Sequence, residues 1–173
     1  PLDPDPERVF RGVDRQVRKA LRKAKEGGLR AIELSDEVTL RERFYPLFLH
    51  SMKRLGSPPH PWSYYGNLHR HLGAHLKVFW AEREGELISG LLGFTLGRRI
   101  HIFNIVSDER HWELRPNDLV HWEFIKWGCE QGYEVFDFST VRYEGQRRFK
   151  EKWGCRFQDY HCYQLSANGW RPR

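Results

Sequence analysis

Near its C-terminus the sequence places two cations at the spacing of one helical face. Residues 146–153 fit a short helix in which Arg147 and Lys150 stand three apart, while Phe149 and Trp153 stand four apart and share another face. The apolar pair would anchor this helix to a sheet and leave the cations exposed, pointing across the end of the preceding strand. A cation held there suits an anionic ligand or a developing oxyanion. We therefore predict a site that stabilises negative charge.

Ahead of that helix, the sequence predicts a strand that carries one acid. Residues 134–141 alternate in character, so Asp137 points away from Phe136 and Phe138. Such an acid is able to accept an ammonium group or to act as a base, and structural pairing with a nearby arginine is an equally good interpretation. Asp137 is therefore a second candidate, with a structural alternative.

The largest concentration of charge lies at the other end of the chain. We expect residues 7–26 to form one amphipathic helix, in which eight Lys or Arg against three acids carry +5 of the net charge of +6. Cations repeated at three-four spacing repel one another, which favours an anionic partner over the competing interpretation, a solvated face. The candidate nucleic-acid contacts are Arg11, Arg15, Arg18, Arg22 and Lys25.

Other patterns that bind metals or form disulfides are weak in this sequence. His71 and His75 stand four apart, but no third ligand is placed, so we expect surface histidines and no metal site. The three cysteines stand far apart without a Cys-x-x-Cys pair, which predicts reduced thiols in a cytoplasm. They are Cys129, Cys155 and Cys162.

The elements that must position these residues follow in a mixed order. Strands are expected at 29–34, 76–83, 86–96, 100–106, 134–141 and 156–165, and helices at 7–26, 38–55, 62–72, 116–131 and 146–153. Asn117 is a plausible cap for the fourth helix, and Gly90 and Gly93 predict a bulge or a close backbone approach within a strand. An antiparallel middle followed by strand-helix units predicts an α/β fold with a mixed sheet.

Length and composition suit one soluble domain with a core of its own, since the 173 residues are 39% hydrophobic and 30% charged. We divide it into the basic helix, residues 1–28, and the domain body, residues 29–173. No apolar run approaches membrane-spanning length, so we expect a cytoplasmic location and leave open a peripheral place at the inner membrane surface. The start Pro-Leu-Asp-Pro-Asp-Pro, without a Met, predicts a fragment or one half of a two-domain protein.

Several motifs together resemble the FemAB-like branch of the GNAT acyltransferase superfamily, and their order and spacing cover most of the chain. They are Phe-Asp-Phe-Ser at 136–139, Gly145, Phe-Lys at 149–150, Trp-Gly at 153–154, Arg-Pro-Asn-Asp-Leu at 115–119, and the basic run at 17–24. The resemblance implies the GNAT fold, a mostly antiparallel mixed sheet flanked by helices. It also implies a second GNAT-like domain in the full-length protein.

The same resemblance implies a function. Members of this branch transfer an aminoacyl group from a charged tRNA to an amine of a peptidoglycan precursor, and a basic helix suits such a donor. Lys150 aligns with a motif lysine that is linked to catalysis in the family. We expect Lys150 to stabilise the oxyanion, with Arg142, Arg147 and Arg115 binding phosphate or carboxylate groups.

One departure from other GNAT enzymes bears on the donor. Residues 109–116 occupy the place of the glycine-rich loop that cradles the pyrophosphate of CoA, but they contain no glycine, and Pro116 lacks an N–H donor. We therefore expect no CoA and no other cofactor. Two alternatives remain open, an N-acyltransferase that uses a CoA or carrier-protein thioester, and a non-catalytic nucleic-acid-binding or scaffold domain.

Overall fold

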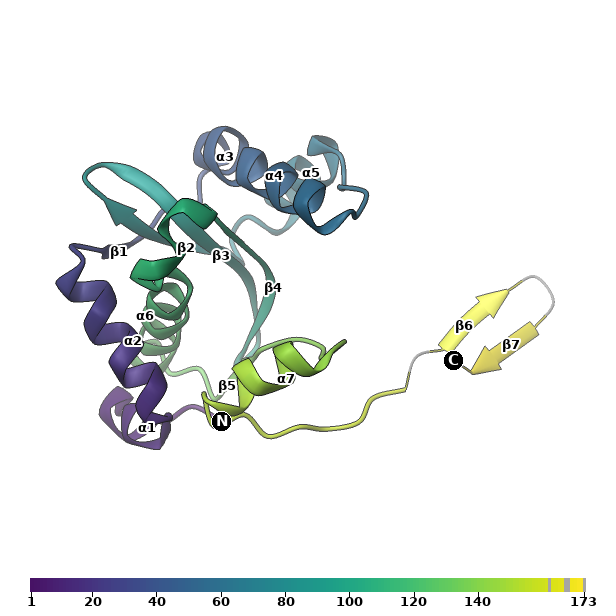
Figure 1. The fold of residues 1–173 in the computed structure, drawn as a ribbon. Coiled ribbons are helices and arrows are strands. Elements are labelled where there is room, and N and C mark those ends of the chain that lie inside the picture. Colours follow the sequence, from purple (N-terminus) through teal and green to yellow (C-terminus); the bar gives the residue numbers. More distant parts are fainter. Residues whose placement is uncertain (162, 167–168, 173) are drawn as a thin grey trace.

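A five-stranded sheet forms the centre of the computed structural model, which describes residues 1–161, 163–166 and 169–172 (Figure 1). Its strands lie in the order β1-β2-β3-β4-β5, and neighbours are antiparallel except for the parallel pair β4 and β5. The α/β class with a mixed, mostly antiparallel sheet is confirmed. The strands are β1 (Arg30–Glu33), β2 (Leu76–Arg83), β3 (Glu86–Leu96), β4 (Arg99–Ser107) and β5 (Val135–Asp137).

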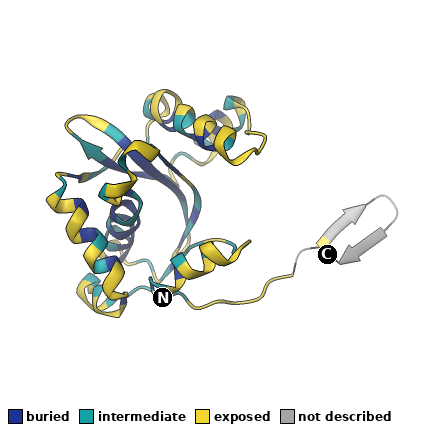
Figure 2. Ribbon diagram, in the orientation of Figure 1, coloured by how far each residue is buried: buried dark blue, intermediate teal, exposed yellow. Residues whose placement is uncertain are grey.

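Helices cover both faces of this sheet, and each face has its own apolar core (Figures 1 and 2). One face carries α1 (Pro6–Gly12), α2 (Arg15–Glu26) and α6 (Pro116–Glu130). The other carries α4 (Tyr45–Leu55) and α5 (Trp62–Leu72), with α3 (Glu37–Thr39) and a π-helical turn, η1 (Leu40–Phe44), leading into α4. A 3-10 turn, η2 (Glu109–Leu114), precedes α6, and α7 (Glu144–Glu151) follows β5.

Close packing explains the two glycines of β3. A Cβ built at Gly90 would lie 2.8 Å from the ring of Trp80, and one at Gly93 would lie 2.9 Å from the ring of Phe124 on α6. The register of β3 against β4 shifts between Leu92 and Gly93. The prediction of a bulge and a close approach at these positions is confirmed, because only glycine leaves room for the two aromatic rings.

The predicted opening helix, residues 7–26, is wrong, since the chain forms two helices there. Asp14 caps α2 by accepting a hydrogen bond from the N–H of Gln16 at 2.6 Å. The guanidinium of Arg18 donates to the carbonyl oxygens of Arg11 at 3.3 Å and Val13 at 3.0 Å, which ties the end of α1 to α2. The capping acid therefore starts a new helix at a point where the apolar spacing continues.

Three smaller predictions also fail. Asn117 lies within α6 rather than capping it, because Arg115 in the left-handed region (φ 62°) stands at the cap position. The apolar spacing of the helix expected at 38–55 predicts that Leu55 points inward, but Leu55 is 59% exposed at the end of α4. The strand predicted at 134–141 pairs with β4 only over the three residues of β5, since the chain turns at Ser139, where φ is 61°.

The last predicted strand, at 156–165, is also wrong in its position. Residues 156–161 adopt no regular structure, while β6 (Tyr163–Ser166) and β7 (Gly169–Pro172) pair in a separate two-stranded sheet. Cys162 lies outside the described residues, and Cys129 and Cys155 are free thiols. Within the described ranges, no helix has both the length and the apolar character needed to cross a membrane.

Candidate functional site

The parallel strands β4 and β5 separate soon after they meet, and two of the sequence-predicted residues, Asp137 and Lys150, lie at this opening. The two strands pair from Arg99 opposite Val135 to His101 opposite Asp137. Beyond that point β4 continues to Ser107, while the chain after β5 turns away into the segment before α7 (Figure 1). In α/β proteins, ligands commonly bind outside the carboxyl ends of strands, where neighbouring strands part.

Lys150 connects α7 to the segment after β5 through two hydrogen bonds. Its Nζ donates to the carbonyl oxygen of Ser139 at 2.9 Å and to that of Thr140 at 2.7 Å. The side chain is buried, with 8% of the residue exposed, so the expectation of an exposed lysine is wrong. Burial lowers the pKa of the ammonium group, while the charges of Cys155 and Asp137 raise it. Since an ammonium has three donors, Lys150 retains one N–H without a hydrogen-bond partner in the described part of the chain.

Asp137 makes the contacts of a structural ion pair. Its Oδ2 lies 3.1 Å from Nη1 of Arg99 and 3.3 Å from Nδ1 of His101, and its Oδ1 accepts the N–H of Ser139 at 2.8 Å. Burial raises the pKa of this carboxyl, but the hydrogen bonds from Ser139, His101 and Arg99 outweigh burial and leave the pKa below its usual value. A carboxylate engaged in this way favours the structural interpretation, and its action as a base stays a prediction.

His121, which the sequence analysis missed, lies beside Lys150 in a box of aromatic rings. Its ring stacks on Phe138 at 5.4 Å between centroids and contacts Phe149 at 5.2 Å and Trp153 at 5.8 Å. Nδ1 lies 2.7 Å from the carbonyl oxygen of Asn117, which only accepts, so the proton resides on Nδ1.

Burial fixes the charge of this imidazole. It lowers the pKa of His121 to about 4; the hydrogen bond to Asn117 opposes this shift, and the charge of Lys150 adds to it. His121 is therefore neutral at physiological pH. A helical projection of α6 would have revealed it, because position 121 stands three and four residues before the buried Phe124 and Ile125 and shares their face.

The three arginines predicted to bind anions do not converge on Lys150. Arg115 occupies the left-handed position that begins α6, and Arg142 is exposed, with its backbone N–H donating to the side chain of Gln146. Arg147 pairs with Glu151 at 3.0 Å, and its guanidinium lies 4.6 Å from the ring centre of Phe157. Their proposed binding roles stay predictions.

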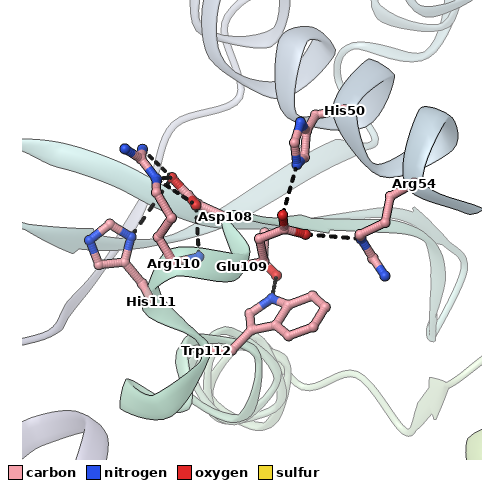
Figure 3. A network of polar contacts seen from close by, with 8 residues as sticks. His50, Arg54, Asp108, Glu109, Arg110, His111 and Trp112 are labelled. Atoms are coloured by element: carbon pink, nitrogen blue, oxygen red, sulfur yellow. Dashed lines mark hydrogen bonds and ion pairs between the residues drawn. The ribbon is translucent and has the colours of Figure 1, made fainter.

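The turn before α6 is locked by side chains from neighbouring elements, as Figure 3 shows. Glu109 pairs with Arg54 of α4 at 3.2 Å and with His50 at 3.5 Å, and the guanidinium of Arg54 lies 4.8 Å from the ring centre of Trp112. The indole of Trp112 in turn donates to the hydroxyl of Ser107 at 2.5 Å. These contacts hold η2 against α4 and β4.

The first turn of α6 is poorly suited to phosphate. Pro116 occupies the first helical position and has no N–H, and the preceding turn contains no glycine that would expose its backbone. Asp118 adds a carboxyl there; burial raises its pKa, and the charges of Arg115 and Lys152 lower it. These residues do not fit a cradle for the pyrophosphate of CoA.

A groove of about 670 Å³ lies instead along α2. Four of the five cations predicted to contact nucleic acid line it, namely Arg15, Arg18, Arg22 and Lys25. Lys19 also lines it and was missed, whereas Arg11 does not line it. The basic helix thus forms one wall of a concave site, which the helical period alone does not indicate.

In this mixed sheet the two parallel strands, β4 and β5, separate beside α6, the helix that follows β4. This arrangement defines the class of the GNAT-type acyltransferases. The chain belongs to the acetyltransferase (GNAT) domain family, which matches residues 11–151. A search of curated proteins by sequence found no match.

Solved structures with the same fold include several transferases. FemX superposes with a TM-score of 0.79 at 15% identity, over 87% of this chain and 56% of the FemX chain. An aminoglycoside acetyltransferase from an uncultured soil metagenomic sample, solved with sisomicin, gives 0.64 at 15% identity, over 80% and 97% of the two chains. The C-terminal domain of a putative lysylphosphatidylglycerol synthetase from Agrobacterium fabrum gives 0.57 at 10% identity, over 80% and 44%. The fold is that of FemX, and this chain spans 56% of its length.

Proposed function

We propose that this chain is a FemAB-like transferase domain that moves an aminoacyl group from a tRNA ester to an amine of a peptide or cell-wall precursor. One observation carries the proposal, namely the contrast between two surfaces of this domain that could bind phosphate groups. The start of α6 has Pro116 and Asp118, whereas α2 lines a groove with five cations. The likeness to FemX supports the same interpretation.

The separation of these surfaces matters because the two donors differ in size. CoA would need its pyrophosphate beside the first turn of α6, close to the strand opening. A tRNA is large enough for its phosphates to rest on a basic helix away from the reacting ester, and phosphate contacts supply most of its affinity. A tRNA donor whose phosphates contact α2 and whose ester lies at the β4–β5 opening would use both surfaces.

The reaction is an acyl substitution that needs no cofactor. The neutral amine nitrogen attacks the ester carbonyl carbon, and the tetrahedral intermediate collapses as the bond to the ribose oxygen breaks. The amine loses a proton, and the released ribose hydroxyl gains one. The chain's contribution is orientation and stabilisation of the oxyanion, for which Lys150 has one remaining N–H.

The binding site for the acceptor is expected to be completed by residues outside this chain. Since the chain spans 56% of FemX, we infer that the full-length protein has a second GNAT-like domain that helps bind the amine-bearing precursor. Charged tRNA and cell-wall precursors are cytoplasmic substrates, so we place the reaction in the cytoplasm, with contact to the inner membrane surface where the precursor is lipid-linked.

A transfer assay tests the proposal. The protein is incubated with a tRNA pool charged with radiolabelled amino acids and a cell-wall precursor peptide, and the product is treated with mild alkali, which cleaves the ester but not an amide. Alkali-stable label on the peptide is the expected result. The test is repeated with the full-length protein, since the acceptor site is inferred to need it.

A thioester-dependent acetyltransferase is the second candidate, favoured by the family to which the chain belongs. The same assay with labelled acetyl-CoA and the same peptide distinguishes the two. Label from acetyl-CoA without label from charged tRNA would contradict our proposal. Binding of tRNA without transfer in either protein would instead identify a non-catalytic RNA-binding or scaffold domain.

A further inference from the structure

The groove along α2 has an apolar floor in addition to its cations. The rings of Phe10 and Trp122 lie 4.8 Å apart between centroids, tilted by 56°, and both line the groove together with Leu21. Phe10 comes from α1 and Trp122 from α6, so three helices build the site. Trp122 and Leu21 are buried in the core, with 6% and 3% of each residue exposed, so the partly exposed Phe10 is the floor residue that is open to a ligand.

The cations on its wall are available for a ligand. Arg15, Lys19, Arg22 and Lys25 are exposed and form no ion pair within the described part of the chain. Arg18 differs, because its guanidinium donates to the carbonyl oxygens of Arg11 and Val13 and so holds the junction of α1 and α2. Two acids, Glu7 and Glu26, also line the groove, so the five cations leave it with an excess of positive charge.

A membrane surface is a poor match for this helix. An interfacial helix inserts its apolar face between lipids. In α2 that face is already used, since Val17, Leu21 and Ala24 are buried against the sheet and α6. The exposed side of α2 offers charge, and the neighbouring aromatic floor lies within a groove rather than on a protruding surface.

We propose that this groove binds single-stranded RNA, with phosphates on Arg15, Lys19 and Arg22 and an unstacked base against the partly exposed ring of Phe10. Basic grooves with aromatic floors bind single strands because every base has a face that stacks on a ring. A duplex keeps its bases stacked inside and would leave the floor unused. The inference rests on the proposed function and specifies which part of a tRNA the groove holds, namely an unpaired stretch.

Fluorescence anisotropy with three labelled probes tests this inference. They are a short oligo(A) RNA, the same strand annealed to oligo(U), and an abasic oligonucleotide of equal length. We expect the oligo(A) strand to bind at least about tenfold more tightly than the other two, the gain being that of one stacked base. Equal binding of all three would overturn the inference, because phosphate contacts alone would then account for the affinity.

The chain offers a matched pair of variants. Arg22 and Lys23 are adjacent exposed cations of α2, but only Arg22 lines the groove. We expect Arg22→Glu to weaken oligo(A) binding several-fold more than Lys23→Glu and to lower the slope of log affinity against log salt by about one. An equal effect of the two variants would show that the groove is not the binding site.

The floor is tested with Phe10→Leu, which should bring oligo(A) binding down to that of the abasic probe while leaving the abasic probe unchanged. If Phe10→Leu unfolds, the comparison of oligo(A) with the abasic probe on the unaltered protein decides the question. Vesicles of phosphatidylglycerol serve as a further probe. Binding to these vesicles in place of RNA would overturn the inference and indicate a lipid surface.

The inference and the proposed function fail in different ways. If tRNA supports transfer but oligo(A) and its duplex bind equally, only the inference is wrong. If oligo(A) binds in the groove with the expected variant effects but charged tRNA supports no transfer, only the proposed function is wrong.

Discussion

The ammonium of Lys150 lies 2.7 Å from the carbonyl oxygen of Thr140, ten residues earlier in the chain. Through this contact α7 holds the segment that leaves β5, at the point where β4 and β5 separate. The sequence predicts that Lys150 is an exposed helix residue, whereas in the structure it is buried and stabilises the segment at the candidate site. Its substitution should therefore affect the fold as well as the reaction.

Lys150→Ala should lower the free energy of unfolding by about 1–3 kcal/mol, because it removes two charge-assisted hydrogen bonds to backbone carbonyls in a partly buried place. Chemical denaturation measures this loss. Arg148→Ala on the same helix is the matched control, since Arg148 is exposed and pairs with the exposed Glu144, and no measurable change is expected. Equal stability of the two variants would contradict the structural role of Lys150.

The same substitution also tests chemistry. If the third N–H of Lys150 stabilises the oxyanion, transfer by Lys150→Ala measured well below its melting temperature should fall by roughly a hundredfold to a thousandfold. A folded Lys150→Ala variant that transfers at the parental rate would limit Lys150 to its structural contacts.

His121 should make the protein sensitive to acid. The pKa of His121 is about 4 in the folded protein and 6.5 in the unfolded chain, so as pH falls below about 6.5 only the unfolded state takes up the proton. The free energy of unfolding should therefore decline between pH 6.5 and 4, by up to about 3 kcal/mol from this group. Denaturation curves at several pH values for the parent and for His121→Leu isolate the effect, which the variant should lack. Parallel pH profiles would show that His121 is not the cause.

Gly93→Ala should destabilise the sheet by about 1–3 kcal/mol through overpacking. The new Cβ would lie 2.9 Å from Phe124 and 3.0 Å from the carbonyl oxygen of His101, which is backbone and cannot move aside. Gly12→Ala is the control, because a Cβ there meets nothing within 4 Å. Thermal denaturation of both variants checks the prediction, and a Gly93→Ala variant as stable as Gly12→Ala would refute the close approach.

CoA should not bind usefully at the start of α6, because Pro116 and the glycine-free turn supply no cradle for its phosphates. Isothermal titration calorimetry with acetyl-CoA should give no measurable heat of binding. A micromolar dissociation constant, about 8 kcal/mol of binding free energy, would favour the thioester-dependent function instead. Charged tRNA in the same buffer is the positive control.

Local patterns predicted much of the fold. The bounds of β2, β3 and α5 agree with the sequence prediction, because strong alternation or helical period ends at clear turn residues such as Gly85 and Gly73. The two glycines of β3 were also interpreted correctly. The break between α1 and α2 was missed because the apolar spacing continues across it, although Asp14 is a capping residue that signals it.

The site was less predictable, since its contacts join residues far apart in the chain. The motif around Lys150 singled out a residue whose catalytic role stays a prediction. The two carbonyl oxygens that accept its hydrogen bonds come from a turn with a left-handed Ser139, which no local pattern indicates. The cations of α2 were visible from their period. The floor of the groove was not, because it combines Phe10 and Trp122 from separate helices.

The concentration of charge on α2 has a kinetic consequence. Residues 7–26 carry eight Lys or Arg against three acids, while the rest of the chain is close to neutral, so the molecule has a pronounced electric dipole with its positive end at α1 and α2. An approaching polyanion would be turned toward that end before contact and would arrive faster than an uncharged ligand of equal size. Steering acts before contact, so it raises the rate of association and does not lengthen the lifetime of the complex. Added salt screens the dipole at long range and would slow the arrival of partners.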